Sequence, residues 1–228
     1  VFLKSDPFAN AFEVAPKNAS VITELSGFQW SDKPWMAERK EKDIQQSPVA
    51  IYEVHLGSWR RKGSQGEEYL SYKELAYQLT DYVLRMGYTH VELLGIIEHL
   101  KEESMGHEIF GFYAPTSRFG TANSLKFLIN YLHQNGIGVI LDWTPVAMTK
   151  DGAGISGFDG TALFETTDQK KASLLKWDTV PFDYSKNQVK NYMFANARFW
   201  MDEFHIDGFR IAALDSLLYE DARSEEHT

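Results

Sequence analysis

From residue 51 onward, short apolar segments with strand periodicity alternate with longer segments of helical periodicity. The first helical segment opens on a capping box formed by Ser71 with Glu74 and ends at Gly87. The apolar segment 138–142 has no polar alternation, which is typical of a parallel strand covered on both faces. We therefore expect strands at 51–56, 90–94, 138–142 and 208–211, with helices over 71–87, 121–136 and 189–204 between them.

Repeated strand–helix units imply a parallel sheet with helices on its outside. Four such units are compatible either with an open doubly wound sheet or with half of a (β/α)8 barrel. A complete barrel needs eight strands and ~250 residues, more than this 228-residue chain supplies. Half a barrel leaves two unpaired sheet edges, so we expect the tail to be an interruption rather than an end.

The organisation of the chain is expected to change along its length. Residues 1–30 contain short apolar bursts separated by Pro and Gly, and they are predicted to be the last strands of a small β-domain. Residues 31–48 are polar and charged and are predicted to be a linker, whereas 49–222 hold the strand–helix units. The start has neither an initiator Met nor a signal-peptide pattern, which suggests that it lies inside a longer protein. Residues 223–228 are predicted to be a non-native tail.

Composition excludes several functional classes. The chain carries 23 Lys and Arg against 32 Asp and Glu, which argues against nucleic acid or an anionic membrane as its main partner. It has no Cys, so it has no disulfide, thiolate nucleophile or Cys-based metal site, and it is compatible with a reducing compartment. No apolar run approaches the ~18 residues of a membrane-spanning helix. The aromatic content of 14% favours large core side chains over stacking platforms for sugars or bases.

Polar side chains stand at the end of each predicted strand. In α/β barrels the reactive groups lie at the carboxyl ends of the strands and in the loops that follow. His55 ends the first strand, Glu98 and His99 follow the second, Asp142 ends the third, and Arg210 lies in the fourth. One such residue would be explained by structure alone, but five at successive strand ends indicate a functional face.

Other kinds of site do not fit the spacing. The glycines of the loop 152–160 lack the Lys and the strand–turn–helix setting of a phosphate loop, and no Gly-x-Ser-x-Gly elbow is present. No His or Cys spacing suggests zinc, and a metal held by His99 and His107 is the less favoured interpretation of their loop. Asp151, Asp159 and Glu165 are expected to be solvated rather than to bind calcium. We expect no metal site.

Several motifs carry a family resemblance. They are 51–61 (IYEVHLGSWRR), 111–121 (GFYAPTSRFGT), 138–145 (GVILDWTP), 158–165 (FDGTALFE) and 205–210 (HIDGFR). Taken in order, they resemble the 1,4-α-glucan (glycogen) branching enzymes of the α-amylase superfamily, glycoside hydrolase family 13. The segment 6–21 resembles the end of the carbohydrate-binding β-sandwich that precedes the barrel in that family. The resemblance extends over about residues 5–221.

The resemblance implies an α/β fold, in which the N-terminal half of a (β/α)8 TIM barrel follows the end of a β-sandwich carbohydrate-binding module. It also implies a cytoplasmic, cofactor-free transferase of glycogen biosynthesis that acts on α-glucan chains. Such an enzyme cleaves an α-1,4 bond with retention and rejoins the chain as an α-1,6 branch. The chemistry needs a carboxylate nucleophile, a protonated carboxylic acid and an oxocarbenium-like transition state.

Three positions depart from the family pattern where this chemistry takes place. The family reads Arg-Val-Asp-Ala-Val after the fourth strand, with Asp as the nucleophile, whereas this chain keeps Arg210 and has Ala212 at the nucleophile position. After the third strand Asp142 is kept, but the sugar-binding His of the family is replaced by Ala147. In the loop after the second strand, His107 stands where a Tyr stacks on the same sugar. As written, the chain is not expected to branch glucan by the family mechanism.

Two functional hypotheses follow. In the first, the chain is part of a branching enzyme-like protein that is inactive because of Ala212. In the second, it is a non-catalytic pseudoenzyme that binds glucan or a partner on the same scaffold. Asp215 is not expected to replace the nucleophile, because it lies three residues further on. The predicted substrate contacts are Glu98, His99, Tyr113 and Trp143, with the substituted positions His107 and Ala147, and Trp59 and Trp177 are further aromatic candidates.

Overall fold

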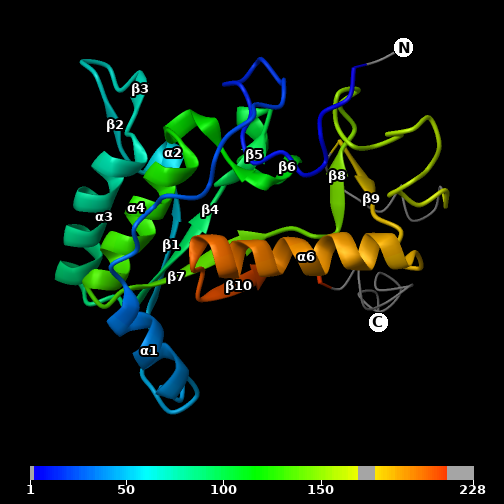
Figure 1. Ribbon diagram of the computed structural model, residues 1–228. Helices are drawn as coiled ribbons and strands as arrows, with labels where there is room; N and C mark the ends of the chain where they lie inside the picture. Colours follow the sequence, from blue (N-terminus) through cyan, green and yellow to red (C-terminus); the bar gives the residue numbers. More distant parts are fainter. Residues whose placement is uncertain (1–2, 169–177, 215–228) are drawn as a thin grey trace, which may run out of the picture.

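A computed structural model describes residues 3–168 and 178–214 (Figure 1). Its centre is a four-stranded parallel sheet in the order β1-β4-β7-β10, which confirms the predicted strand–helix alternation and is the strand order of half a (β/α)8 barrel. The strands are β1 (Ile51–His55), β4 (His90–Leu94), β7 (Gly138–Trp143) and β10 (Gly208–Ile211). The helices are α1 (Lys33–Glu41), α2 (Leu56–Trp59), α3 (Tyr72–Met86), α4 (Ala122–Gln134) and α6 (Asn187–Phe204).

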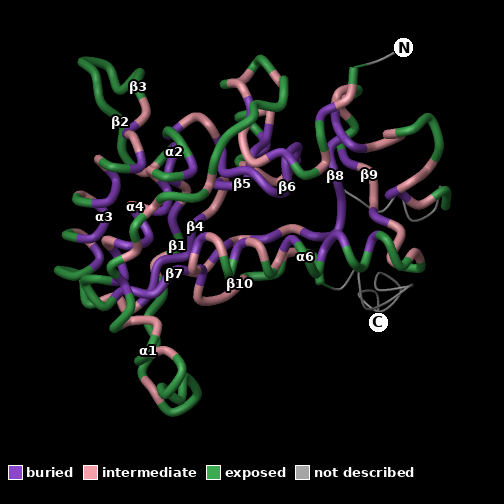
Figure 2. Tube along the Cα trace, viewed as in Figure 1, coloured by how far each residue is buried: buried purple, intermediate pink, exposed green. Residues whose placement is uncertain are grey.

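The two faces of the sheet have different surroundings. Alternate residues point to opposite faces of a strand, and one set, which includes Val91, Leu93, Val139 and Leu141, is fully buried against the helices. This layer of apolar side chains is the core of the molecule. Figure 2 marks residues along β4 and β7 as buried. The residues between them in sequence face the other side of the sheet, where the inside of a barrel lies.

The two ends of helix α3 are determined by its local sequence. The Ser71 side chain accepts a hydrogen bond from the Glu74 backbone N–H, and the Glu74 carboxylate accepts one from the Ser71 N–H. The helix ends at Gly87, whose φ of +80° is the left-handed conformation that glycine adopts without strain. Both ends coincide with those predicted from sequence.

The capping box should therefore contribute measurably to stability. We expect Ser71→Ala to lower the free energy of unfolding by about 1 kcal/mol, because a backbone N–H loses its partner. The hydrogen bond from the Ser71 backbone is the main cause that lowers the pKa of Glu74 from 4.5 to about 2. The contribution of Glu74 is thus present above about pH 4.5 and disappears as the pH falls toward about 2. Urea unfolding of Glu74→Gln at both ends of this range, with exposed Glu68→Gln as the control, checks the sign.

Three short antiparallel ladders follow the strands of the sheet. They pair β2 (Arg61–Lys62) with β3 (Glu68–Tyr69), β5 (Ile97–His99) with β6 (Ile109–Pro115), and β8 (Ala147–Thr149) with β9 (Thr179–Pro181). Two 3-10 turns, Glu102–Ser104 and Ser117–Phe119, lie in the same region. The sequence predicted loops here. It missed β6, all seven residues of which are buried.

The amino-terminal segment lies across the loops after the sheet. In the described residues 3–30 the only β pairing is an isolated bridge between Phe12 and Ser20, so the predicted end of a β-sandwich stays a prediction. The Phe12 ring lies so close to Gly111 that a Cβ there would be 2.2 Å from it, which requires glycine at this position. The predicted linker contains α1, which projects from the body as a separate arm (Figure 1).

Candidate functional site

The centre of the candidate site is an ion pair between neighbouring strands. Arg210 of β10 and Asp142 of β7 are register partners, and Arg210 Nη1 donates to Asp142 Oδ1 at 2.9 Å. The Asp142 side chain is 6% exposed, whereas the Arg210 side chain is half exposed. The structure thus brings together two of the predicted residues, and it leaves part of the guanidinium accessible on the barrel-interior face.

Two further carboxylates share this face. Glu53 of β1 and Glu92 of β4 are register partners, and both are in electrostatic contact with the Arg210–Asp142 pair. Burial raises the pKa of Glu92, the negative charges of Glu53 and Asp142 raise it further, and Arg210 opposes them. Sequence reasoning missed both residues. The signal was available, because Glu53 lies two residues before His55 and Glu92 lies on the matching strand.

Ala212 lies at the next inward-facing position after Arg210. Its backbone N–H donates to the Trp143 carbonyl oxygen at 3.1 Å, which continues the β10–β7 ladder one residue beyond the strand. Because it is two residues from Arg210, its methyl group belongs on the same face. The chain turns at once, since Ala213 has a φ of +53°. The face therefore carries a methyl group beside Arg210, and the role of this position as that of the nucleophile stays a prediction. Asp215 lies outside the described residues.

His107 belongs to a tight turn packed on the carboxyl end of β4. A Cβ on Gly106 would be 2.4 Å from the Gly95 Cα atom, so the turn approaches the strand end through two glycines. His107 is close enough to His55 to lower its pKa, although burial is the main cause of that shift. The structure thus places His55 and His107 together at the carboxyl ends of β1 and β4.

Glu98 and His99 are buried beneath this surface. Glu98 is 1% exposed and accepts hydrogen bonds from the Thr116 hydroxyl, the Ser117 backbone N–H and Arg118. His99 Nδ1 pairs with the Ile97 carbonyl oxygen at 2.9 Å, and burial lowers its pKa to about 4. Both side chains are thus held by contacts within the protein. Their contact with substrate stays a prediction.

Tyr113, Trp143 and Ala147 are also packed into the protein. The Tyr113 hydroxyl donates to the Tyr192 carbonyl oxygen at 2.8 Å, and Trp143 Nε1 donates to Asn196 Oδ1 of α6 at 2.9 Å. Ala147 is 3% exposed and is paired within the β8–β9 ladder. All three side chains are buried, and their predicted contact with sugar stays a prediction. Trp177 lies outside the described residues.

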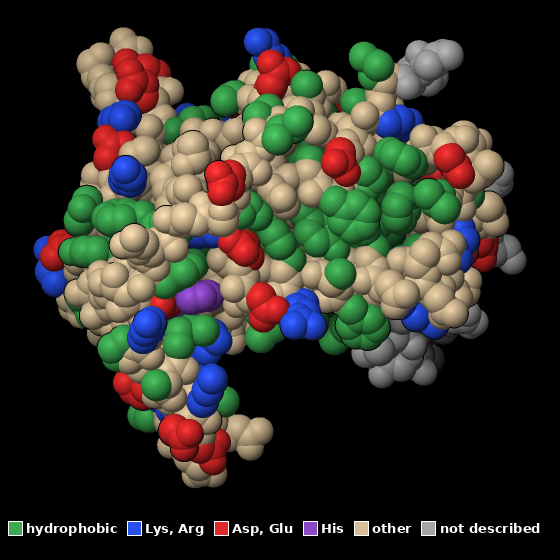
Figure 3. Space-filling view, viewed as in Figure 1, with side chains coloured by type: hydrophobic (Ala, Val, Ile, Leu, Met, Phe, Trp, Pro, Cys, Tyr) green, Lys and Arg blue, Asp and Glu red, His purple; other side chains and the backbone are tan. Residues whose placement is uncertain are grey.

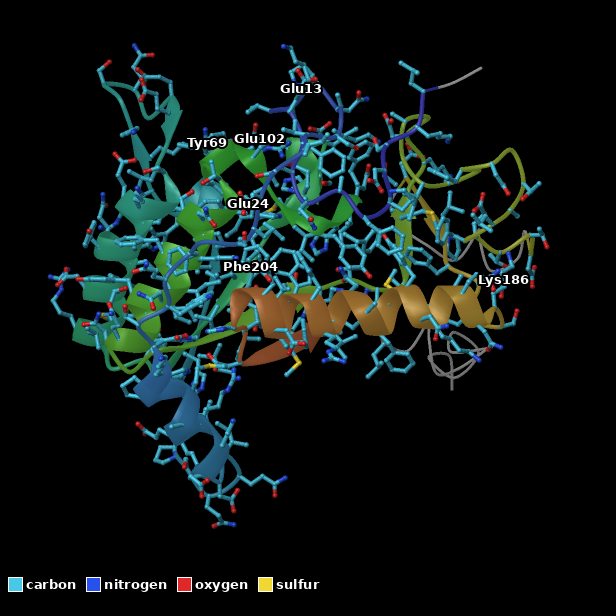
Figure 4. All side chains as sticks on the ribbon, in the orientation of Figure 1. Glu13, Glu24, Tyr69, Glu102, Lys186 and Phe204 are labelled. Carbon is cyan, nitrogen blue, oxygen red and sulfur yellow. The ribbon has the colours of Figure 1, made fainter. Side chains whose placement is uncertain are left out.

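A polar group that sequence reasoning missed stands above β1. Arg61 donates to Glu102 at 2.9 Å, and the Tyr69 hydroxyl donates to the same carboxylate. Figure 4 shows Tyr69 and Glu102 side by side. The Arg61 guanidinium also lies 4.0 Å from the centre of the Tyr69 ring. Arg61 and Tyr69 follow β1 in sequence, and Glu102 follows β5. Their contacts therefore connect the segments that follow these two strands.

The described residues hold neither a metal-binding cluster nor a membrane-spanning helix. In residues 3–168 and 178–214, no group of three or more His, Asp or Glu side chains is arranged to hold a metal ion. None of the helices in these residues combines the length and apolar character that a membrane crossing requires.

The structure resembles solved proteins of the α-amylase type. It matches a putative alpha amylase from Salmonella typhimurium with a TM-score of 0.74 and 22% identity, over 96% of this chain and 34% of that one. It also matches a pullulanase mutant from Paenibacillus barengoltzii complexed with maltotetraose, with a TM-score of 0.69 and 20% identity, over 91% and 36% of the two chains. These likenesses confirm the predicted fold.

Sequence relatives are considerably more similar. No family model matches the chain. The chain is 49% identical to the 1,4-alpha-glucan branching enzyme of Cellvibrio japonicus and 47% identical to that of Hydrogenovibrio crunogenus, over 97% of its own length in each case. It is 46% identical to that of Protochlamydia amoebophila over 99% of its length. It spans about 30% of the length of these relatives. The chain is therefore a homologue of the 1,4-alpha-glucan branching enzymes and corresponds to about a third of their length.

Proposed function

We propose that this chain is part of a branching enzyme-like protein that binds α-glucan on the open face of its half barrel but does not cleave it. The observation that carries the proposal is the combination of an intact Arg210–Asp142 pair with a methyl group at position 212. The scaffold that would orient a nucleophile is present, whereas the nucleophile position holds a group that cannot attack carbon. The proposal includes a cytoplasmic role in storage-glucan metabolism, which the similarity to branching enzymes supports and with which the absence of Cys is compatible.

The geometry supports binding through hydrogen bonds to sugar hydroxyls. Half of the Arg210 side chain is exposed, and its described bond uses only Nη1, so other N–H groups of the guanidinium can donate to a hydroxyl. Glu53 and Glu92 offer acceptors on the same face. His107, in the turn beside His55, adds a polar group at the rim. Such a mixture of donors and acceptors suits a neutral, hydroxyl-rich ligand.

Sedimentation with glycogen tests the proposal. We expect the chain to sediment with glycogen and to leave the iodine stain of the glucan unchanged. Arg210→Leu is expected to weaken binding about tenfold or more, because a charge-assisted hydrogen bond contributes about 1.5–3 kcal/mol. Arg198→Leu is the matched control, since Arg198 also pairs with an aspartate, at 2.8 Å, but is exposed on α6 away from the sheet.

The second candidate is a non-catalytic protein that binds a partner rather than glucan. Absence of sedimentation at all glycogen concentrations, with a folded chain, would contradict glucan binding and favour this candidate. A fall in the iodine absorbance on incubation would contradict the other half of the proposal, since it would show that α-1,4 bonds of the glucan are being cleaved.

A further inference from the structure

A buried cluster of acidic and imidazole side chains joins the arm to the barrel, on the side opposite to the candidate site. The strap, defined here as residues 30–41, passes the turns that precede β7 and β10. Asp32 of the strap is 1% exposed, and its Oδ2 accepts hydrogen bonds from His133 Nδ1 at 2.9 Å and from His205 Nδ1 at 2.7 Å. The other carboxylate oxygen of Asp32 has no partner. The two imidazoles therefore hold this carboxylate in place.

His133 lies between two carboxylates. Its Nε2 pairs with Asp207 Oδ2 at 3.0 Å, while its Nδ1 pairs with Asp32. The His133 side chain is completely buried. An ionised carboxylate only accepts hydrogen bonds, so both ring nitrogens must carry a proton for both contacts to be favourable. The arrangement thus fits the imidazolium form of His133.

Both aspartates are held in their ionised form. Burial alone would raise the pKa of Asp32, but the hydrogen bonds from His133 and His205 outweigh it and lower the pKa below its ordinary value. The same balance lowers the pKa of Asp207, where the bond from His133 again opposes burial. Asp207 also accepts from Arg39 Nη1 at 2.9 Å. With Arg39 and an imidazolium at His133, the two buried negative charges are balanced.

Other groups surround the cluster. Trp30 stacks on the His205 ring at 3.8 Å, and Trp35 stacks on His133 and donates to Asp207 at 2.9 Å. Other titratable and charged groups face the cluster: Lys33, Glu38, Arg39 and Lys40 of the strap, Lys42 just after it, His90 of β4, and His205 at the end of α6. At the junction of the arm and the body, a histidine side chain reaches the surface in Figure 3.

Other contacts also hold the strap. Helix α1 has no buried residue, and Figure 2 shows most of the arm as exposed. The apolar contacts of the strap come from Trp30, which packs against the core and stacks on His205, and from Trp35, which stacks on His133. The Ser31 backbone N–H donates to Asn130 Oδ1 at 2.8 Å, and Arg39 Nη1 donates to the Ile206 carbonyl oxygen at 3.2 Å. The bonds of His133 to Asp32 and Asp207 are the part of this docking that changes with protonation of the ring.

We propose that the Asp32–His133–Asp207 cluster is a proton-dependent latch that docks the strap on the barrel while His133 carries two protons and releases it when His133 loses one. Loss of the proton leaves a bare ring nitrogen about 3 Å from a carboxylate oxygen, and it leaves one buried negative charge without a counter-charge. His205 can keep its contact in either state, because a neutral imidazole still donates through Nδ1. The protonation of one buried side chain therefore decides whether the segment before the barrel is fixed.

Indole N–H signals in an NMR pH titration of the full chain test the latch. Trp35 reports on the latch through its bond to Asp207, whereas Trp143 and Trp200 donate to partners in the core and serve as internal references. Raising the pH from about 6 to about 9 is expected to shift or broaden the Trp35 signal while the Trp143 and Trp200 signals stay unchanged. Backbone amides of the strap should exchange at least about tenfold faster, after correction for the intrinsic rate, once the latch opens.

A matched variant separates the latch from a general effect of pH. His133→Gln cannot titrate, so its Trp35 signal and strap exchange are expected to be independent of pH over this range. Unchanged Trp143 and Trp200 signals establish that the variant is folded. If it is not folded, the ring-nitrogen shifts of His133 in the unmodified chain decide, because the latch requires two N–H groups in the docked state. A bare ring nitrogen in the docked state, or a pH-independent Trp35 signal in the unmodified chain, overturns the proposal.

Discussion

Glucan chain transfer by this protein is expected to be slower than that of a branching enzyme by a factor on the order of 10⁴–10⁶, the loss that follows removal of a nucleophile in other enzymes. A retaining mechanism passes through a covalent bond between a carboxylate oxygen and the sugar. The Ala212 methyl group offers no such oxygen, although Arg210 and Asp142 are still paired beside it. The fall in iodine absorbance of amylose measures the rate, with the Cellvibrio japonicus enzyme assayed in parallel.

Two variants at position 212 test whether the missing carboxylate is the cause of the slow chain transfer. Ala212→Asp places a carboxylate beside Arg210, whereas Ala212→Asn places a group of the same size that cannot form the ester. A sugar–enzyme adduct is expected only with Ala212→Asp, and mass spectrometry after incubation with an activated glucosyl fluoride detects it. Chain transfer by the unmodified chain within about a hundredfold of the relative would contradict the prediction, because it would require a nucleophile at a position other than 212.

The second large effect concerns the buried pair of Glu98 and Arg118. Their side chains are 1% and 7% exposed, and Nη1 of Arg118 lies 3.1 Å from Oε1 of Glu98. Arg118 also donates to the carbonyl oxygens of His99 and Leu100. We expect Glu98→Leu to lower the free energy of unfolding by about 3–5 kcal/mol, since it leaves a buried guanidinium without its counter-charge. Urea denaturation followed by circular dichroism measures the change.

An exposed pair in the same region provides the control. Glu102 is 58% exposed and pairs with Arg61 at 2.9 Å, so Glu102→Leu is expected to cost only about 0–1 kcal/mol. The double variant Glu98→Leu with Arg118→Met should recover much of the lost stability, because neither charge is then buried alone. Equal losses for Glu98→Leu and Glu102→Leu would show that burial is not the deciding factor and that this explanation is wrong.

The candidate site was only partly predictable from sequence. Arg210 and Asp142 were predicted as a catalytic pair, and the structure brings them together, because parallel strands place their carboxyl ends side by side. Glu98 and His99 follow the second strand in the same manner, yet both are buried. Both are buried because β5 pairs with β6 in an antiparallel ladder. This pairing joins residues that are separated in the sequence, and it leaves no periodic signal there.

The positions of the aromatic residues were also only partly predictable from sequence. Trp143 directly follows Asp142, and sequence reasoning placed both on the binding face. In a strand, however, neighbours point to opposite sides, so Asp142 faces the barrel interior while Trp143 packs toward α6. The sequence predicts that neighbouring residues of the strand point to opposite faces of the sheet. Which of the two faces each residue takes is known only once the helices are placed.

The sequence by itself determined the order of strands and helices and the ends of α3, and it shows Ala at position 212, where the family resemblance predicts a carboxylate. Each depends on local chemistry: periodicity, capping side chains and the identity of a single residue. Only the tertiary structure decided that Glu53 and Glu92 share a face with Arg210 and that Asp32, His133 and Asp207 meet at the opposite end. These groups come from segments as far apart as residues 32 and 207. Their contacts depend on how the sheet and helices pack, which no local pattern records.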